Sequence, residues 1–213
     1  AADVQRGLEL YGKAVEAGHA YAMNGLGASY LYGQNVEKDE QRAHRLFESS
    51  VERNDIWGVM NLALLYRDGV VVEQDRERAL SMLRQAHEGM VPHAGRLIGL
   101  MLRQEENPDQ AEVFRYFRES AERGDAWSAY HAAEMMQAGT ATEAEDGEAV
   151  RLYGFAVGRN AGTPSQNARE KLVGLPRAKV ATEIQKALVR LGDQSVEVDG
   201  ALGPKTRDAA AAL

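Results

Sequence analysis

Histidine, carboxylate and serine side chains are the groups in this chain that could catalyse a reaction or bind a metal. His131 and Glu134 stand three residues apart, so a helix would place both on one face. A zinc site needs at least three protein ligands, and no third ligand accompanies this pair. A solvated or buried structural histidine is therefore the better interpretation, and no metal site is predicted.

The other polar motifs also lack the features of an active site. The acidic residues at 105–106 and between 143 and 146 are expected in solvated loops, where nothing would separate their pKa values into an acid and a base. No serine stands in a G-x-S-x-G sequence, and the absence of cysteine excludes thiolate catalysis and disulfides. The run from Gly200 to Thr206 has the wrong glycine spacing for a phosphate-binding loop, and Pro204 lacks a needed backbone N–H. We expect no enzyme activity and no cofactor.

Composition and charge further limit the class of protein that this chain can be. The 213 residues are 44% hydrophobic and 27% charged, which is typical of a folded globular chain, and no apolar run is long enough to span a bilayer. The net charge is −7, with 16 Lys and Arg against 26 Asp and Glu in residues 1–157, and 9 against 6 in residues 158–213. The acidic body argues against nucleic acid as a partner, and the basic tail indicates a second module.

A small–large–small triplet recurs five times and predicts the architecture. Each copy has the spacing i, i+4, i+7, which is one face of a helix, and successive copies are 34 to 36 residues apart. The copies are Gly7/Tyr11/Ala14, Ala43/Phe47/Ser50, Ala79/Leu83/Ala86, Val113/Phe117/Ser120 and Ala149/Tyr153/Ala156. A repeat of this length is typical of a solenoid, in which each helix pair buries its apolar face only against its neighbours.

A second motif lies between the triplets and predicts the other helix of each pair. Leu26-Gly27-x-x-Tyr30-x-x-Gly33 recurs as Leu62-Ala63-x-x-Tyr66-x-x-Gly69, and in looser form before Met101 and Met136. The small residue would let the paired helix approach closely, and the last glycine suits a left-handed helix C-cap. An aspartate is expected to cap the next helix in each of the first three units: Asp39, Asp75 and Asp109.

These periodicities predict a leading helix at about 3–17 and four helix pairs after it. The first helices are expected at about 20–32, 56–68, 91–103 and 126–138, and the second at about 39–53, 75–88, 109–123 and 146–158. Gly18, Asn54, Gly89 and Gly124 are expected in the turns between pairs. Because the chain opens midway through a repeat, we interpret it as a piece of a longer protein.

Residues 3–158 resemble the Sel-one-like repeat, a relative of the tetratricopeptide repeat. The first unit matches that pattern at Ala20, Ala22, Leu26, Gly27, Tyr30, Gly33, Asp39, Ala43 and Phe47, and the second at Leu62, Tyr66, Gly69, Asp75, Ala79 and Ala86. Units three and four are looser, with Gln104 in place of the cap glycine and Ala132 in place of the leucine. The resemblance implies an all-α, right-handed α-solenoid of antiparallel helix pairs, with about four repeats and a leading half-repeat. It also implies a scaffold for protein interactions, commonly in bacterial envelope, secretion or signalling systems, and no enzyme.

The C-terminal residues are interpreted as a small helical module. Helices are expected at about 165–174 and 177–191, after a linker rich in glycine and proline. Ile184, Gln185, Leu188 and Gly192, followed by Asp199, Gly200, Gly203 and Thr206, resemble the front half of a peptidoglycan-binding-domain-one-like fold. The last four are the candidate glycan motif, with Thr206 as a helix N-cap. The predicted domains are a solenoid at 1–158, a linker and capping helix at 159–176, and a partial peptidoglycan-binding-like module at 177–213.

The second residue of each first helix is the strongest candidate for contact with a partner, because this position faces the concave side in tetratricopeptide-like solenoids. The candidates are Tyr21, Trp57 and Trp127, with Pro92 in the third unit, and then Asn24, Met60 and Tyr130 at the next groove positions. Aromatic and methionine side chains suit an adaptable peptide-binding surface. The alternative is that both sets pack between neighbouring helices.

The first functional hypothesis is therefore a scaffold that binds another protein or a peptide on its concave face. The two resemblances favour the bacterial periplasm or cell envelope, with the cytoplasm as the alternative compartment. The second hypothesis is the targeting arm of a larger envelope hydrolase, with its catalytic domain outside this chain and peptidoglycan binding as its main role. Neither hypothesis requires a cofactor, nucleic acid or a membrane span.

Overall fold

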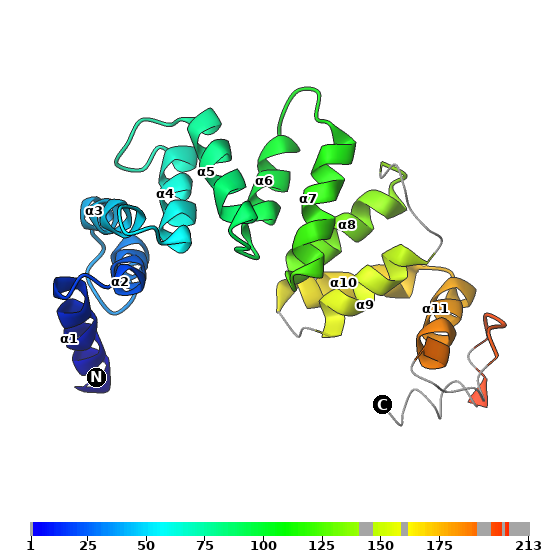
Figure 1. The fold of residues 1–213 in the computed structure, drawn as a ribbon. Coiled ribbons are helices and arrows are strands. Elements are labelled where there is room, and N and C mark those ends of the chain that lie inside the picture. Colours follow the sequence, from blue (N-terminus) through cyan, green and yellow to red (C-terminus); the bar gives the residue numbers. More distant parts are fainter. Residues whose placement is uncertain (1, 141–146, 159–161, 191–196, 202, 205–213) are drawn as a thin grey trace. The chain divides into compact units, whose positions relative to one another are not determined.

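The computed structural model of this 213-residue chain describes residues 2–140, 147–158, 162–190, 197–201 and 203–204. These residues form eleven α-helices, and none of them lies in a β-strand (Figure 1). The chain divides into two compact units, Ala1–Met101 and Leu102–Leu213, and each is described here by itself. The predicted all-α class is confirmed for the described part of the chain.

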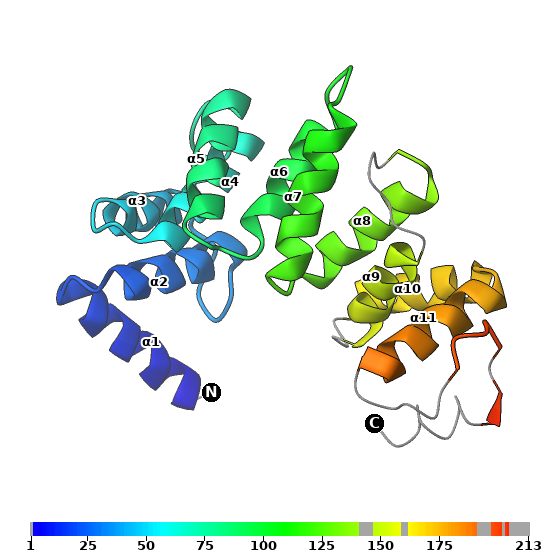
Figure 2. The ribbon, with the colours of Figure 1, turned by 45° about the vertical axis from the view of Figure 1, so that its right-hand side comes forward.

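The N-terminal unit is built from helices that pack in pairs. They are α1 (Ala2–Glu16), α2 (Ala20–Tyr32), α3 (Glu40–Val51), α4 (Ile56–Asp68), α5 (Arg76–Glu88) and α6 (Ala94–Leu102), whose last residue belongs to the second unit. Helix α2 packs on α3 and α4 packs on α5, while contacts of α1 with α2 and of α3 with α4 join one pair to the next. Figure 2 shows α1 beside α2 from a second direction.

The C-terminal unit continues the same pairing and then adds two further helices. Its helices are α7 (Gln110–Glu122), α8 (Ala126–Gln137), α9 (Glu148–Gly158), α10 (Thr163–Gly174) and α11 (Arg177–Arg190). Helix α8 packs between α7 and α9, α10 covers α8 and α9, and α11 packs on α9. The buried carboxylate of Glu183 in α11 lies 3.9 Å from Arg151 Nε in α9.

The first helix of each pair is called A-type (α2, α4, α6 and α8), and the triplet-bearing helix is called B-type (α1, α3, α5, α7 and α9). Every predicted helix is present, and no boundary differs by more than three residues. The largest difference is at α6, which begins at Ala94 because Pro92 and His93 form a turn. Pro92 therefore precedes its helix, and the prediction that it occupies the second helical position is wrong.

Aspartate side chains cap the starts of five of the eleven described helices, and the sequence predicts three of these caps. Asp39, Asp75 and Asp109 each accept a hydrogen bond from a backbone N–H in the first turn of the following helix, at 2.8, 2.9 and 2.9 Å. Gly33 and Gly69 end α2 and α4 with φ of 65° and 68°, in the left-handed region that suits glycine. Gly89 lies in the turn after α5, as predicted, and the residue with a positive φ in that turn is Met90.

The triplets form the line along which the B-type helices α3, α5, α7 and α9 are buried. Their central residues Phe47, Leu83, Phe117 and Tyr153 have no exposed surface. In the first pair the contact is close enough to require glycine, because a Cβ on Gly27 would lie 2.7 Å from Phe47 Cε1. In this pair the small residue beside the leucine therefore sets the distance between the two helices.

Candidate protein-binding surface

Tyr21 is the most exposed of the predicted binding residues. It is the second residue of α2, and its side chain is 71% exposed, although a tyrosine ring is largely apolar. Asn24 in the next turn is buried, and its Oδ1 accepts a hydrogen bond of 2.7 Å from Asn61 Nδ2 of α4. In this unit the Tyr21 side chain is thus accessible, while Asn24 links two A-type helices.

Trp57 occupies the same register one repeat later. It is half-buried at the second position of α4, and its backbone N–H donates a hydrogen bond of 3.3 Å to Asp55 Oδ1. Met60, the next predicted residue, is only 8% exposed. Part of the Trp57 side chain is therefore accessible, whereas Met60 mainly fills the space between helices.

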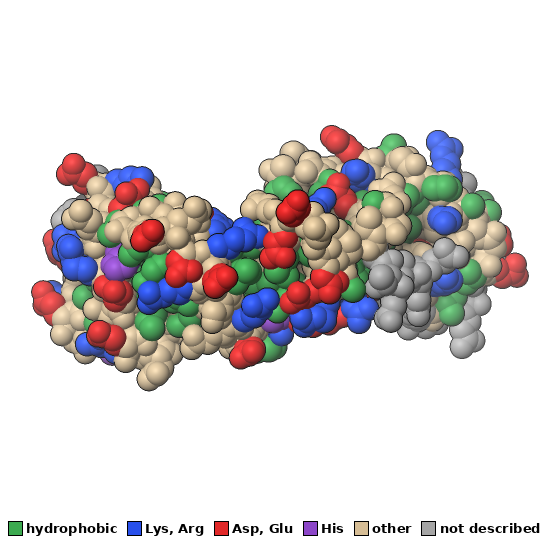
Figure 3. Space-filling model, turned by 90° about the horizontal axis from the view of Figure 1, so that it is seen from above, with side chains coloured by type: hydrophobic (Ala, Val, Ile, Leu, Met, Phe, Trp, Pro, Cys, Tyr) green, Lys and Arg blue, Asp and Glu red, His purple; other side chains and the backbone are tan. Residues whose placement is uncertain are grey.

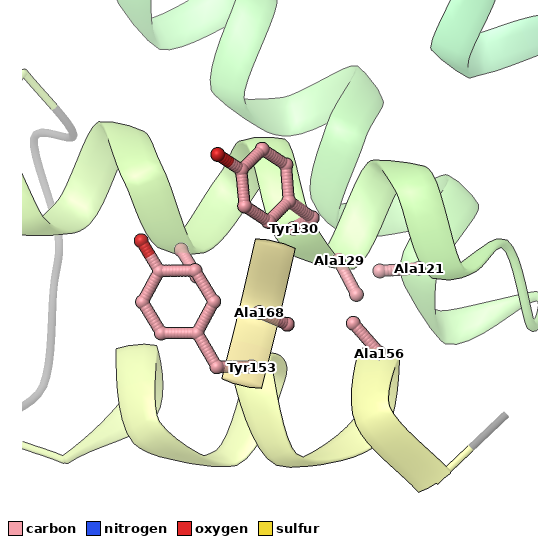
Figure 4. Close-up of a cluster of buried hydrophobic side chains, with 7 residues drawn as sticks. Ala121, Ala129, Tyr130, Tyr153, Ala156 and Ala168 are labelled. Carbon is pink, nitrogen blue, oxygen red and sulfur yellow. The ribbon is translucent and has the colours of Figure 1, made fainter. Parts of the chain in front are cut away.

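Trp127 in the second unit lies against buried side chains. It packs on a cluster that includes Ala121, Ala129 and Tyr153, and its ring stacks on that of His131 with a centroid separation of 5.8 Å. Figure 4 shows Tyr130 of α8 and Tyr153 of α9 side by side in this cluster, with ring centroids 5.9 Å apart. Much of the Trp127 side chain therefore packs between helices, which is the alternative that the sequence left open.

Tyr130 and Glu134 form the centre of a polar network at the end of α8. The Tyr130 hydroxyl donates a hydrogen bond of 2.7 Å to Glu134 Oε1, and Lys171 Nζ lies 3.4 Å from the same oxygen. Burial, and then this hydrogen bond to a carboxylate, raises the pKa of Tyr130 to about 12. His131 Nδ1 lies 3.5 Å from Glu134 Oε2. Within the described residues no three His, Cys, Asp or Glu side chains gather as a metal site would require.

The C-terminal motif is held together by Gln185, which is 1% exposed. Its Nε2 donates hydrogen bonds of 2.6 Å to Asp199 Oδ1 and 2.8 Å to the Ala201 carbonyl, and its Oε1 accepts from the N–H groups of Asp199 and Gly200. The hydrogen bond from the Ala201 N–H, and then that from Gln185, lowers the pKa of Asp199. Gln185 thus joins α11 to the turn at Asp199 and Gly200 by hydrogen bonds. Thr206 lies outside the described residues.

Charge is interspersed on the surface. Figure 3 shows acidic and basic side chains alternating with hydrophobic ones on the visible face, without a continuous basic area. This pattern accords with the net charge of −7. No described helix is long and apolar enough to cross a bilayer.

The stacked helix pairs, with their repeated caps and buried triplets, define a helical repeat protein. A family model of the Sel1 repeat matches residues 1–19, 20–55, 59–88 and 97–125, which together make up more than half of the chain. The chain therefore belongs to the Sel1 repeat family. The matched residues end before α8, so the predicted domain boundaries at 158 and 176 stay predictions.

Solved structures of three bacterial proteins are similar to this chain. A Sel1 repeat protein from Oxalobacter formigenes is 23% identical over 95% of this chain and 74% of its own, with a TM-score of 0.66. A protective antigen of uropathogenic Escherichia coli with an SLR fold is 25% identical over 85% of this chain and 40% of its own, with a TM-score of 0.62. An immunity protein from Pseudomonas aeruginosa is 20% identical over 97% and 67%, with a TM-score of 0.56. No curated protein sequence matches the chain.

These similarities confirm the α-solenoid fold class. Sel1 repeats generally form scaffolds for protein–protein interaction and are typically not catalytic. The family match ends at residue 125, before the predicted peptidoglycan-binding segment, and none of the three solved structures is named as a peptidoglycan-binding protein.

Proposed function

We propose that this protein is a scaffold that binds a protein or peptide segment on the exposed face of its A-type helices, with Tyr21 as the main anchor in the N-terminal unit. The observation that carries the proposal is the 71% exposure of Tyr21 on a short helix that ends in a left-handed glycine cap. A rigid aromatic side chain loses little conformational entropy on binding and gains a large apolar contact. Trp57, in the same register of the next repeat, would extend the contact.

The buried candidates have a supporting role in this proposal. Asn24, Met60 and Tyr130 are each 8% exposed, so a partner could reach only a small part of them. They would keep the A-type helices at a constant spacing.

The envelope location and the peptidoglycan alternative have less support. Asp199 and Gly200 both form hydrogen bonds with Gln185. This arrangement suits a turn that stabilises the fold at least as well as it suits a glycan-binding site. The bacterial envelope remains an expectation drawn from the sequence resemblances.

A peptide-display selection tests the proposal. The wild-type chain would be used to select peptides from a random library, and each selected peptide would be measured against Tyr21→Ala, Trp57→Ala and the control Val173→Ala. Val173 is 86% exposed in α10, so its truncation removes an exposed apolar side chain elsewhere. We expect Tyr21→Ala to weaken binding by about tenfold or more and Val173→Ala to leave it unchanged. The proposal would be contradicted if the selected peptides bound Tyr21→Ala and Trp57→Ala as tightly as they bind the wild type.

A further inference from the structure

A cavity of about 460 Å³ lies at the C-terminal end of α8, within the second unit. A volume of this size is in the range of small-ligand pockets. The polar residues that line it are Arg103, Gln110, Glu134, Gln137, Thr140 and Lys171. They come from the residue that follows α6, the start of α7, the end of α8 and the middle of α10. Polar side chains from four helices or their ends thus gather around one cavity.

Arg103 is a cation of this lining without an anionic partner. Its side chain is exposed, and no hydrogen bond or ion pair joins its guanidinium to another residue in the described part of the chain. It lies near the Tyr130 hydroxyl, because its charge opposes the rise in the pKa of Tyr130 that burial and Glu134 cause. The five N–H donors of the guanidinium are therefore available to a ligand.

Glu134 is the one acidic residue among the described residues that line the cavity, and its carboxylate already has partners. Its Oε1 accepts the hydrogen bond from Tyr130, and Lys171 Nζ lies 3.4 Å from the same oxygen. Glu170 also acts on Tyr130 but does not line the cavity. Since Lys171 balances Glu134, the charge of Arg103 leaves the lining with one net positive charge.

The uncharged polar residues add further donors. The Tyr153 hydroxyl donates a hydrogen bond of 3.0 Å to Gln137 Oε1, which leaves the two N–H groups of Gln137 Nε2 for other partners. The Gln110 side chain forms no hydrogen bond with any described residue. The Thr140 hydroxyl donates to the Met135 carbonyl. The cavity therefore offers donors and one positive charge, so its complement is a group with acceptor oxygens and a single negative charge.

We propose that this cavity binds a carboxylate group, with Arg103 donating two parallel N–H···O hydrogen bonds and Gln137 Nε2 a further one. A carboxylate matches the planar guanidinium fork and carries the single negative charge that the lining balances. A phosphate group carries a larger charge, which would be repelled by Glu134. The carboxylate would belong to an acidic side chain of a bound peptide or to a free small carboxylate. The site uses neither Tyr21 nor Trp57, so it can be tested separately from the function proposed above.

Nuclear magnetic resonance of the full, isotopically labelled chain would detect binding, because it reports weak affinities residue by residue. The probes are two short peptides with blocked ends, identical except for a central glutamate or glutamine, each added up to roughly 10 mM in chloride buffer. The signals to follow are the side-chain amide of Gln137 and the Nε–H of Arg103. We expect the glutamate peptide to shift both signals until they saturate, and the glutamine peptide to leave them unchanged.

Variants of the protein locate the site. Arg103→Gln should weaken binding of the glutamate peptide by about tenfold or more, because it removes the charged hydrogen bonds. Arg177→Gln, at an exposed arginine of α11 outside the cavity, is the matched control and should bind like the wild type. Glu134→Gln should tighten binding by about threefold or more, because it removes a negative charge from the lining and releases Lys171. Misfolding would not produce this gain, and circular dichroism would verify that each variant is helical.

Sodium propionate identifies the source of the carboxylate. Equal affinity for propionate and the glutamate peptide would assign the cavity to a free small carboxylate, and tighter binding of the peptide would assign it to a side chain of a bound segment. Three results would overturn the proposal: equal shifts with the glutamine peptide, an unchanged affinity in Arg103→Gln, or tighter binding of inorganic phosphate than of either carboxylate.

Discussion

The Ser50 hydroxyl, in the last turn of α3, donates a hydrogen bond of 2.7 Å to Asp55 Oδ2 at the start of α4. Ser50 has no exposed surface, and the other carboxylate oxygen of Asp55 accepts the N–H of Trp57. The pair joins the end of one repeat to the beginning of the next, and the carboxylate lies at the positive end of the α4 dipole. Side chains as well as backbone thus hold the turn between repeats.

Replacing Ser50 by alanine should therefore destabilise the N-terminal unit. The change leaves an oxygen of the half-buried Asp55 carboxylate without this donor, so we expect the free energy of unfolding to fall by about 1–2 kcal/mol. Urea denaturation followed by circular dichroism would measure it. Ser81→Ala on the exposed surface of α5 is the matched control and should stay within about 0.5 kcal/mol of the wild type. Equal stability of both variants would show that the Ser50–Asp55 bond contributes nothing.

Two glycine-to-alanine substitutions should have opposite effects. At Gly27 the new Cβ would lie 2.7 Å from Phe47, and overpacking of this kind costs about 1–3 kcal/mol. At Gly7 the Cβ would meet nothing, and alanine is favoured over glycine inside a helix by about 0.5–1 kcal/mol. Chemical denaturation should thus show Gly27→Ala below the wild type and Gly7→Ala at or above it. A gain in stability at Gly27 would mean that α2 and α3 are not in close contact.

Tyr130 should make the second unit sensitive to alkaline pH. Its pKa in the folded state is about 12, above the ordinary tyrosine value, so the folded state holds the proton more tightly than the unfolded state. The resulting stability is fully present below pH 10 and is lost as the pH rises toward 12. The urea concentration at the midpoint of unfolding, measured at several pH values in this range, should fall less steeply with pH for Tyr130→Phe than for the wild type. Parallel curves for the two proteins would contradict the assignment.

Gln185 should control the order of the C-terminal turn. Its side chain satisfies the N–H groups of Asp199 and Gly200 and the carbonyl of Ala201. In Gln185→Ala, amide hydrogen exchange at Gly200 should accelerate by about tenfold or more, since a lost bond of about 1.4 kcal/mol corresponds to that factor. Gln166→Ala, at an exposed position of α10, is the control. Unchanged exchange at Gly200 would show that the turn holds its conformation without the glutamine.

The positions of the helices were predictable because their signals are local. Periodic apolar residues and aspartate caps act within one or two helical turns, and the predicted boundaries therefore agree with the structure to within three residues. The caps of α4 and α8 were not predicted, although Asp55 and Asp125 stand directly before those helices in the sequence. Both carboxylates accept a backbone N–H in the first turn of the following helix, from Trp57 and Ser128, so the signal for these caps is also local and was present in the sequence.

By itself the sequence determined the repeat, the family, the alternation of A-type and B-type helices and the small residues that let them approach, because each is a pattern of residue types at regular intervals. Only the tertiary structure decided which residues are exposed among those at equivalent positions of different repeats. Tyr21 and Trp57 share one register, yet Tyr21 is exposed and Trp57 is half-buried. Tyr11 and Phe47 share another, yet only Phe47 is fully buried. Exposure depends on how closely the adjacent helices cover a residue, and that is set only when the helices pack in the folded chain.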